Sequence, residues 1–135
     1  MMHILIPVDG SEPSFRAVEF AAKLAAGNGS KLTILAVRQY IVGRHMTAGV
    51  WSQEEVDRIL AKAKILLTTV GMMHFITAEI NSRDVAHAIV NYAEEHDVGL
   101  IVMGASGMGN VKAFVIGSIS AEVLRKSICP VTIVH

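Results

Sequence analysis

Residues 2–13, MHILIPVDGSEP, combine the patterns of a strand, a tight turn and a helix start within one short stretch. Met2–Val8 is a continuous apolar run, which is typical of a strand buried on both faces. Asp9-Gly10-Ser11 breaks that run, and serine is favoured at the position that caps a helix. The Glu-Pro pair that follows is favoured in a first helical turn. This stretch therefore predicts a strand, a turn and a helix capped by Ser11.

The same alternation repeats along the chain. Further short apolar runs predict strands at Leu32–Val37, Phe75–Ile80, Leu100–Met103 and Pro130–Val134. Amphipathic spacing predicts four helices between these strands. The first ends at Gly27, and the second runs from a capping box at Ser52 and Glu55 to Gly71. The third begins at a Ser82 cap, and the fourth begins near Ser118 with Val123 and Leu124 facing inward. Residues 38–51 show no clear period and predict a long loop.

Strands that alternate with amphipathic helices predict an α/β fold. Because the strands read as continuous apolar runs, the sheet should be parallel and covered by helices on both faces. Right-handed crossovers then favour a single doubly wound layer. The length of 135 residues suits one domain, residues 1–135.

Composition excludes several classes of protein. Twelve Lys and Arg balance twelve Asp and Glu, so the formal net charge is +0, which argues against a nucleic-acid binder. Apolar residues make up 52% of the chain, which excludes intrinsic disorder. One cysteine, Cys129, excludes a disulfide framework, and the histidines show no metal-ligand spacing. With no signal-peptide pattern and no long apolar run, we expect a soluble cytoplasmic protein.

A glycine-rich loop follows the fourth predicted strand, Gly104-Ala-Ser-Gly107-Met-Gly109-Asn-Val-Lys-Ala-Phe-Val-Ile-Gly117-Ser118-Ile-Ser120. In a doubly wound sheet, ligands bind at the carboxyl ends of the strands, where this loop begins. Glycines allow close approach of the backbone, and a helix start near Gly117 offers free amides to an anion. The hydroxyls of Ser118 and Ser120 add further donors. The loop therefore predicts a phosphate site built largely from backbone.

Two common nucleotide motifs are absent from this loop. A P-loop would need Lys and Ser or Thr directly after its second glycine, but Gly104-x4-Gly109 is followed by Asn110 and Val111. A dinucleotide fingerprint would need a third glycine where Lys112 stands, and it would follow the first strand.

The spacing that is present is G-x2-G-x9-G-[S/T], formed by Gly104, Gly107, Gly117 and Ser118. With ILIPVDGSEPS, LTILAV, GLIVMG and GSISAEVLRKSICPVTIV, it makes the whole chain resemble a universal stress protein of the nucleotide-binding type. The resemblance implies a five-stranded parallel sheet in the order 3-2-1-4-5. It also implies ATP, or possibly ADP or AMP, as ligand, with Mg²⁺ held through the phosphates.

The resemblance assigns site residues by position. The backbone of Pro7 and Val8 together with Val37 would line an adenine pocket, with Asp9 near the nucleoside and Met103 and Gly104 near the ribose. The residues that would hold the phosphates are Gly107, Gly117, Ser118, Ile119 and Ser120. A homodimer is implied, often formed through the edge strand at Val131–Val134. Asp9 also suits an Asx turn beside Gly10, and the two roles can coexist.

The chain departs from the family pattern at three places. Ser106 stands where relatives often carry Arg or His, Ala36-Val37 stands where His-Val is usual, and Asn81–Asp84 replaces a common Gly-Asp/Asn-Pro turn. The first change removes a possible charge from the phosphate side.

Three functions are open at this point. The first is an ATP-binding regulatory protein of the stress response with at most slow hydrolysis, because no nucleophile–base pair is evident. The second is a nucleotide-free dimeric module for protein interaction. The third is an enzyme that handles adenylates, against which the absence of a His-x-Gly-His motif after the first strand counts.

Overall fold

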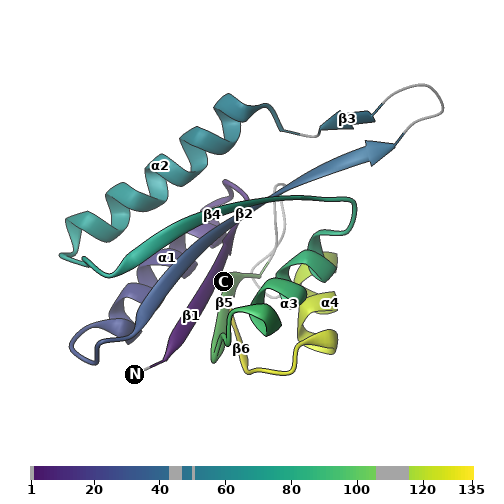
Figure 1. Ribbon diagram of the computed structural model, residues 1–135. Helices are drawn as coiled ribbons and strands as arrows, with labels where there is room; N and C mark the ends of the chain where they lie inside the picture. The colour runs from purple at the N-terminus through teal and green to yellow at the C-terminus, as the bar shows by residue number, and fades with distance from the viewer. Residues whose placement is uncertain (1, 43–46, 50, 106–115) are drawn as a thin grey trace.

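The computed structural model describes residues 2–42, 47–49, 51–105 and 116–135. Within them, helices cover both faces of a twisted sheet (Figure 1). The strands are β1 (His3–Val8), β2 (Lys31–Val42), β3 (Thr47–Gly49), β4 (Phe75–Ser82), β5 (Leu100–Gly104) and β6 (Val131–Val134). The helices are α1 (Glu12–Ala25), α2 (Gln53–Thr69), α3 (Val85–Glu95) and α4 (Ser118–Lys126).

The main sheet consists of parallel strands in the order β4-β2-β1-β5-β6. Without the short β3, this is the predicted order 3-2-1-4-5, which is confirmed. The chain adds β2 and β4 on one side of β1 and then crosses to place β5 and β6 on the other. The switch point therefore lies at β1, and its carboxyl end is where a ligand crevice is expected.

The core has two halves, one on each face of the sheet. Alternate side chains of β1 serve different halves, because successive residues of a strand point to opposite faces. Ile4 and Ile6 pack with α1 and α2, whereas Leu5 packs with α3. All three are almost completely buried. In the part of the chain that the structure describes, no helix is long and apolar enough to cross a membrane.

The prediction of a loop over residues 38–51 is wrong for its described part. Strand β2 continues to Val42, and its last residues pair antiparallel with β3, Tyr40 opposite Gly49. Strand β4 also runs further than expected, so that Ser82 lies opposite Gln39. The extra residues of β2 and β4 become strand because neighbouring strands pair with them. Such pairing leaves no local period in the sequence, so it was not predicted. Residues 43–46 and 50 lie outside the described part.

The first two predicted helix caps are confirmed. The amide of Ser14 donates to Ser11 Oγ at 3.3 Å, and the amide of Glu55 donates to Ser52 Oγ at 3.2 Å. Each bond satisfies one of the amides that a helix start leaves without an intrahelical partner.

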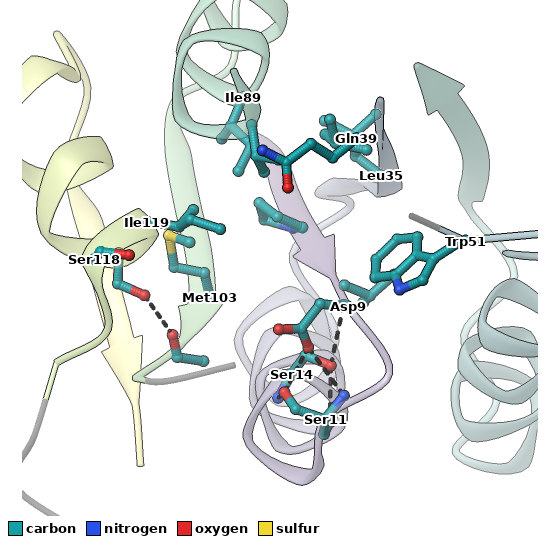
Figure 2. Close-up of a pocket in the computed structure, with 16 residues that line it drawn as sticks. Asp9, Ser11, Ser14, Leu35, Gln39, Trp51, Ile89, Met103, Ser118 and Ile119 are labelled. Atoms are coloured by element: carbon teal, nitrogen blue, oxygen red, sulfur yellow. Dashed lines mark hydrogen bonds between the residues drawn. The ribbon is translucent and has the colours of Figure 1, made fainter. Parts of the chain in front are cut away.

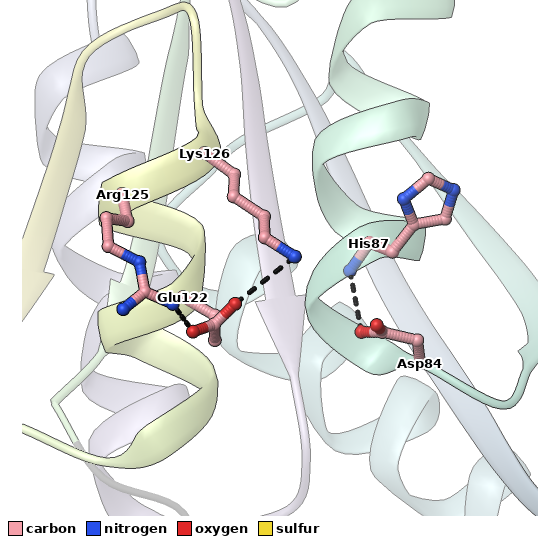
Figure 3. Close-up of polar contacts among 5 residues, drawn as sticks. All are labelled: Asp84, His87, Glu122, Arg125 and Lys126. Carbon is pink, nitrogen blue, oxygen red and sulfur yellow. Dashed lines mark hydrogen bonds and ion pairs between the residues drawn. The ribbon is translucent and has the colours of Figure 1, made fainter.

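The predicted cap of the third helix is wrong. Asp84, not Ser82, caps α3, because its Oδ1 accepts a 3.0 Å bond from the amide of His87 (Figure 3). Ser82 is occupied by its pairing in β4, and its hydroxyl bonds the backbone of Asp84 instead.

The predicted start of the last helix near Ser118 is confirmed, with Gly117 in the cap position, and so is the inward side chain of Val123, which is fully buried. The prediction that Leu124 faces inward is wrong, because this side chain is 41% exposed. On the exposed side of this helix, Glu122 forms ion pairs with Arg125 and with Lys126, the latter at 3.2 Å (Figure 3). These exposed pairs contribute little stability.

Replacing the cap of α3 tests this assignment. Asp84→Ala should lower the free energy of unfolding by about 1 kcal/mol, because the His87 amide loses its acceptor. Asp84→Asn keeps an acceptor oxygen and should stay close to wild type. Urea unfolding followed by circular dichroism measures both variants, and equal losses in the two would contradict capping by Asp84.

Candidate functional site

A pocket of about 330 Å³ opens at the carboxyl ends of β1 and β5, beside the middle of β2. It therefore lies at the switch point of the sheet. Helices α3 and α4 close it on one side, and the turn into α1 forms its floor (Figure 2). The residues that line it are Pro7, Val8, Asp9, Ser11, Ser14, Leu35, Val37, Gln39, Trp51, Val85, Ile89, Met103, Gly104, Ser118, Ile119 and Ser120.

One part of the pocket is apolar. Leu35 and Val37 come from β2, Ile89 from α3 and Met103 from the end of β5, and each is at most 5% exposed. Trp51, just before α2, lies across from them (Figure 2). Apolar walls with an aromatic ring among them suit a planar ring system, such as a nucleobase.

The floor of the pocket is the turn between β1 and α1. Asp9 Oδ1 accepts bonds from the amide of Ser11 at 2.9 Å and from its hydroxyl at 2.5 Å, which is the Asx turn considered above. Gly10 follows with a φ of +86°, a conformation that glycine adopts without strain. Among the described residues, no donor reaches Asp9 Oδ2. One carboxylate oxygen therefore stays available to a ligand.

Gly104 is required by close packing. A Cβ built on it would lie 2.7 Å from the carbonyl carbon of Pro13 and 2.8 Å from the amide nitrogen of Ser14, both in the first turn of α1. Such contacts do not occur in real proteins, and backbone atoms cannot move aside as a flexible side chain can. The absence of a side chain here therefore lets the end of β5 pack directly on α1.

The start of α4 forms the polar rim of the pocket. Gly117 has no side chain to cap the helix, and its own amide donates to the carbonyl of Ala105 at 2.6 Å. The next three amides, of Ser118, Ile119 and Ser120, have no hydrogen-bond partner among the described residues. Free amides and the positive end of the helix dipole favour an anion at this position.

The structure brings most of the predicted site residues together. Those that line the pocket are Pro7, Val8, Asp9, Val37, Met103, Gly104, Ser118, Ile119 and Ser120. Gly117 lies beside the pocket with its amide already engaged, and Gly107 lies outside the described residues. The Ser120 hydroxyl donates to the Gly104 carbonyl at 2.8 Å, so it serves the fold. The binding role of these residues stays a prediction.

Seven lining residues were not assigned to the site from the sequence: Ser11, Ser14, Leu35, Gln39, Trp51, Val85 and Ile89. Gln39 lies beyond the predicted end of its strand, although the two-residue period of Leu35 and Val37 could have placed it on the same face. Trp51 stands at the end of the stretch that was predicted to be a long loop. It packs against the core, and it also lines the pocket. Arg38 holds it in place by donating from Nε to the Trp51 carbonyl at 2.8 Å.

Charge is sparse in this pocket. Asp9 is the only ionisable side chain among the described residues that line it. The described residues also contain no group of three His, Cys, Asp or Glu side chains that could hold a metal ion. In the described part, the donors at the rim are therefore the backbone amides at the start of α4 and the Ser118 hydroxyl, none of them charged.

Comparison with known proteins gives a consistent result along the whole chain. The family model described as the universal stress protein family matches residues 1–135. The universal stress protein YxiE of Bacillus subtilis is 33% identical over 146 aligned positions, which cover 98% of this chain and 97% of that protein.

Solved structures are similar over the same length. A universal stress protein in complex with cAMP superposes with a TM-score of 0.77 at 26% identity, covering 99% of this chain and 96% of the other. A universal stress protein from Archaeoglobus fulgidus superposes with a TM-score of 0.79 at 22% identity, covering 100% and 99%. The second likeness supports the fold alone.

The packing of Gly104 leads to a prediction about stability. Gly104→Ala should lower the free energy of unfolding by about 1–3 kcal/mol, because the added methyl group collides with backbone of α1. Gly99→Ala is the matched control, since a Cβ there meets its nearest atom at an ordinary 3.5 Å. Chemical denaturation measures both variants. If Gly104→Ala were as stable as Gly99→Ala, the close approach would be refuted.

Proposed function

The chain belongs to the universal stress protein family, and from this premise we propose that it binds an adenine nucleotide in the pocket at the carboxyl edge of its sheet. The observation that carries the proposal is the start of α4, whose three free amides border an apolar pocket. Among the helices that the structure describes, α1, α2 and α3 are capped by the side chains of Ser11, Ser52 and Asp84. The described helix beside the pocket, α4, has no side-chain cap, so its start is open to an external anion.

In this proposal the two parts of the pocket bind the two parts of a nucleotide. The apolar walls formed by Val37, Ile89 and Met103 take the base, and the Asp9 carboxylate accepts bonds from ribose hydroxyls. The amides at the start of α4 hold the phosphates. The relative solved with cAMP, at 26% identity, supports an adenine nucleotide as the class of ligand.

We propose ATP as the nucleotide, with Mg²⁺ held through its phosphates. A metal ion held in this way needs few ligands from the protein, because it retains several waters and binds phosphate oxygens. The glycine spacing Gly104, Gly107, Gly117 and Ser118 supports a polyphosphate, since the resemblance assigns Gly107, Gly117 and Ser118 to the phosphates.

We propose that the consequence of binding is regulatory. In the part of the chain that the structure describes, the pocket offers one carboxylate and no histidine, lysine or cysteine. Rapid hydrolysis needs a positioned base or metal site, so binding with at most slow turnover is expected. The function would be a nucleotide-dependent part of the stress response in the cytoplasm, where ATP is available.

A charge placed at the start of α4 tests the proposal. Ser118→Asp should weaken ATP binding roughly tenfold, because a carboxylate would lie beside the phosphates. The same change should not destabilise the fold, since an acidic residue in a first helical turn adds about 0.3–1 kcal/mol of stability. Calorimetric titration of nucleotide-stripped protein, with and without Mg²⁺, measures the affinity.

Ser118→Asn is the matched control, because asparagine has nearly the same shape as aspartate and carries no charge. This variant should bind ATP almost as wild type does. The chain contains a single tryptophan, Trp51, so its fluorescence gives a second readout from inside the pocket. If wild type showed no heat and no fluorescence change at millimolar ATP, nucleotide binding would be excluded and an interaction module favoured.

We also propose a homodimer through β6, which ends the strand order of the described sheet. The carbonyls of Pro130 and Val134 accept bonds from the amides of Ile101 and Ala105. Residues in alternate positions of a strand point their backbone groups the same way, so those of Val131 and Ile133 face outward. An edge with free donors and acceptors is a template for pairing with a second copy.

Ile133→Pro removes one outward amide and should convert the dimer to a monomer, because proline cannot donate to a ladder across the edge. Sedimentation velocity over a range of concentrations measures the change. Far-ultraviolet circular dichroism and ATP titration of the same variant establish that it remains folded. A wild-type protein that is monomeric at all concentrations would contradict this proposal and leave nucleotide binding untouched.

A further inference from the structure

Among the described residues that line the pocket, Gln39 is the only one with a side-chain amide. It borders the apolar part of the pocket. It continues the face of β2 formed by Leu35 and Val37, since residues two apart on a strand point the same way. Its side chain is half-buried at the upper rim of the pocket (Figure 2). The Asp9 carboxylate lies at the floor of the pocket, so Gln39 would meet a different portion of a ligand.

The orientation of this amide is determined by its neighbour. Gln39 Nε2 lies 3.3 Å from the carbonyl oxygen of Arg83, in the connection between β4 and α3. A backbone carbonyl only accepts hydrogen bonds, so the amino group of Gln39 must face Arg83. The oxygen Oε1 is thereby directed away from Arg83, and Figure 2 shows it pointing into the space between Met103 and Trp51.

That oxygen is an acceptor without a donor. None of the described residues donates a hydrogen bond to Gln39 Oε1. Leu35, Val37 and Ile89, which line the same pocket, are apolar and can supply none. A ligand that fills this part of the pocket excludes water from Oε1, and a buried acceptor left unpaired costs binding free energy. The favoured ligand is therefore one that offers an N–H group here.

We propose that Gln39 determines the choice of base by accepting a hydrogen bond from the 6-amino group of adenine. This inference rests on the proposed function and adds to it a specificity-determining side chain. Guanine and hypoxanthine carry a carbonyl oxygen at position 6, and two acceptor oxygens facing each other repel. Gln39 thus favours adenine and disfavours guanine and hypoxanthine. Specific sites commonly combine an attraction for one ligand with a repulsion of its competitors in this way.

Three triphosphates that differ in the group at position 6 of the purine test this inference. ATP carries an amino group there, purine riboside triphosphate carries only hydrogen, and inosine triphosphate carries an oxygen and an added proton on N1. Wild type should bind purine riboside triphosphate roughly two- to tenfold more weakly than ATP, because one hydrogen bond is lost. Inosine triphosphate should bind more weakly still.

Gln39→Met keeps the length of the side chain and removes both polar atoms. In this variant the affinities for ATP and purine riboside triphosphate should become equal within about twofold, because neither then has a partner at position 6. Asn91→Leu is the matched control, since it removes an amide on the exposed side of α3 that bonds Glu95 and does not line the pocket. It should keep the wild-type order of affinities.

The outcomes separate this inference from the proposed function. If wild type binds none of the three nucleotides, the proposed function fails and the inference fails with it. If wild type binds all three equally, nucleotide binding stands and the role of Gln39 is overturned. If wild type prefers ATP and Gln39→Met retains the whole preference, base choice lies elsewhere in the pocket and Gln39 is again excluded.

Discussion

The contact between Gly104 and the first turn of α1 determines the geometry of the pocket. At this point β5 ends against backbone atoms of Pro13 and Ser14, with no room for a Cβ between them. The turn after β1 and the end of β5 are thereby held as two adjacent walls. The Ser120 hydroxyl bonds the Gly104 carbonyl, and the Gly117 amide bonds the carbonyl of Ala105, so the start of α4 is attached to the same point. The turn after β1, the end of β5 and the start of α4 are therefore all held together at Gly104 and Ala105.

The two halves of the core explain why a pocket forms at this edge and not along the sheet. Each strand contributes alternate side chains to both halves, so the middle of the sheet is fully covered by α1 and α2 on one face and by α3 on the other. Helices that cover a sheet do not meet at the ends of the strands, where connections leave in different directions. At β1 those connections diverge to opposite sides. The apolar ends of β1 and β5 and the middle of β2 are left there to form the wall of the pocket.

Sequence predicted the elements that depend on local pattern and missed those that depend on pairing. The apolar runs located every strand of the parallel sheet, and serine caps located two helix starts. The end of β2 was missed because Gln39 and Tyr40 become strand only through Ser82 and Gly49 opposite them. Resemblance to a family supplied the positions around the pocket. It could not supply Gln39, whose orientation depends on the Arg83 carbonyl more than forty residues away.

Backbone donors at the rim of the pocket have a consequence for sequence divergence. The three free amides at the start of α4 belong to peptide groups, which every amino acid except proline possesses. A substitution at Ser118 or Ile119 changes what surrounds an anion and leaves its donors in place. Lineages of this fold can therefore diverge widely along α4, altering its surface and its partners, without dismantling the rim. What must be kept is the direction in which the helix begins, and that direction depends on the close packing of Gly104 and on the Ser120 hydroxyl more than on the side chains of Ser118 and Ile119.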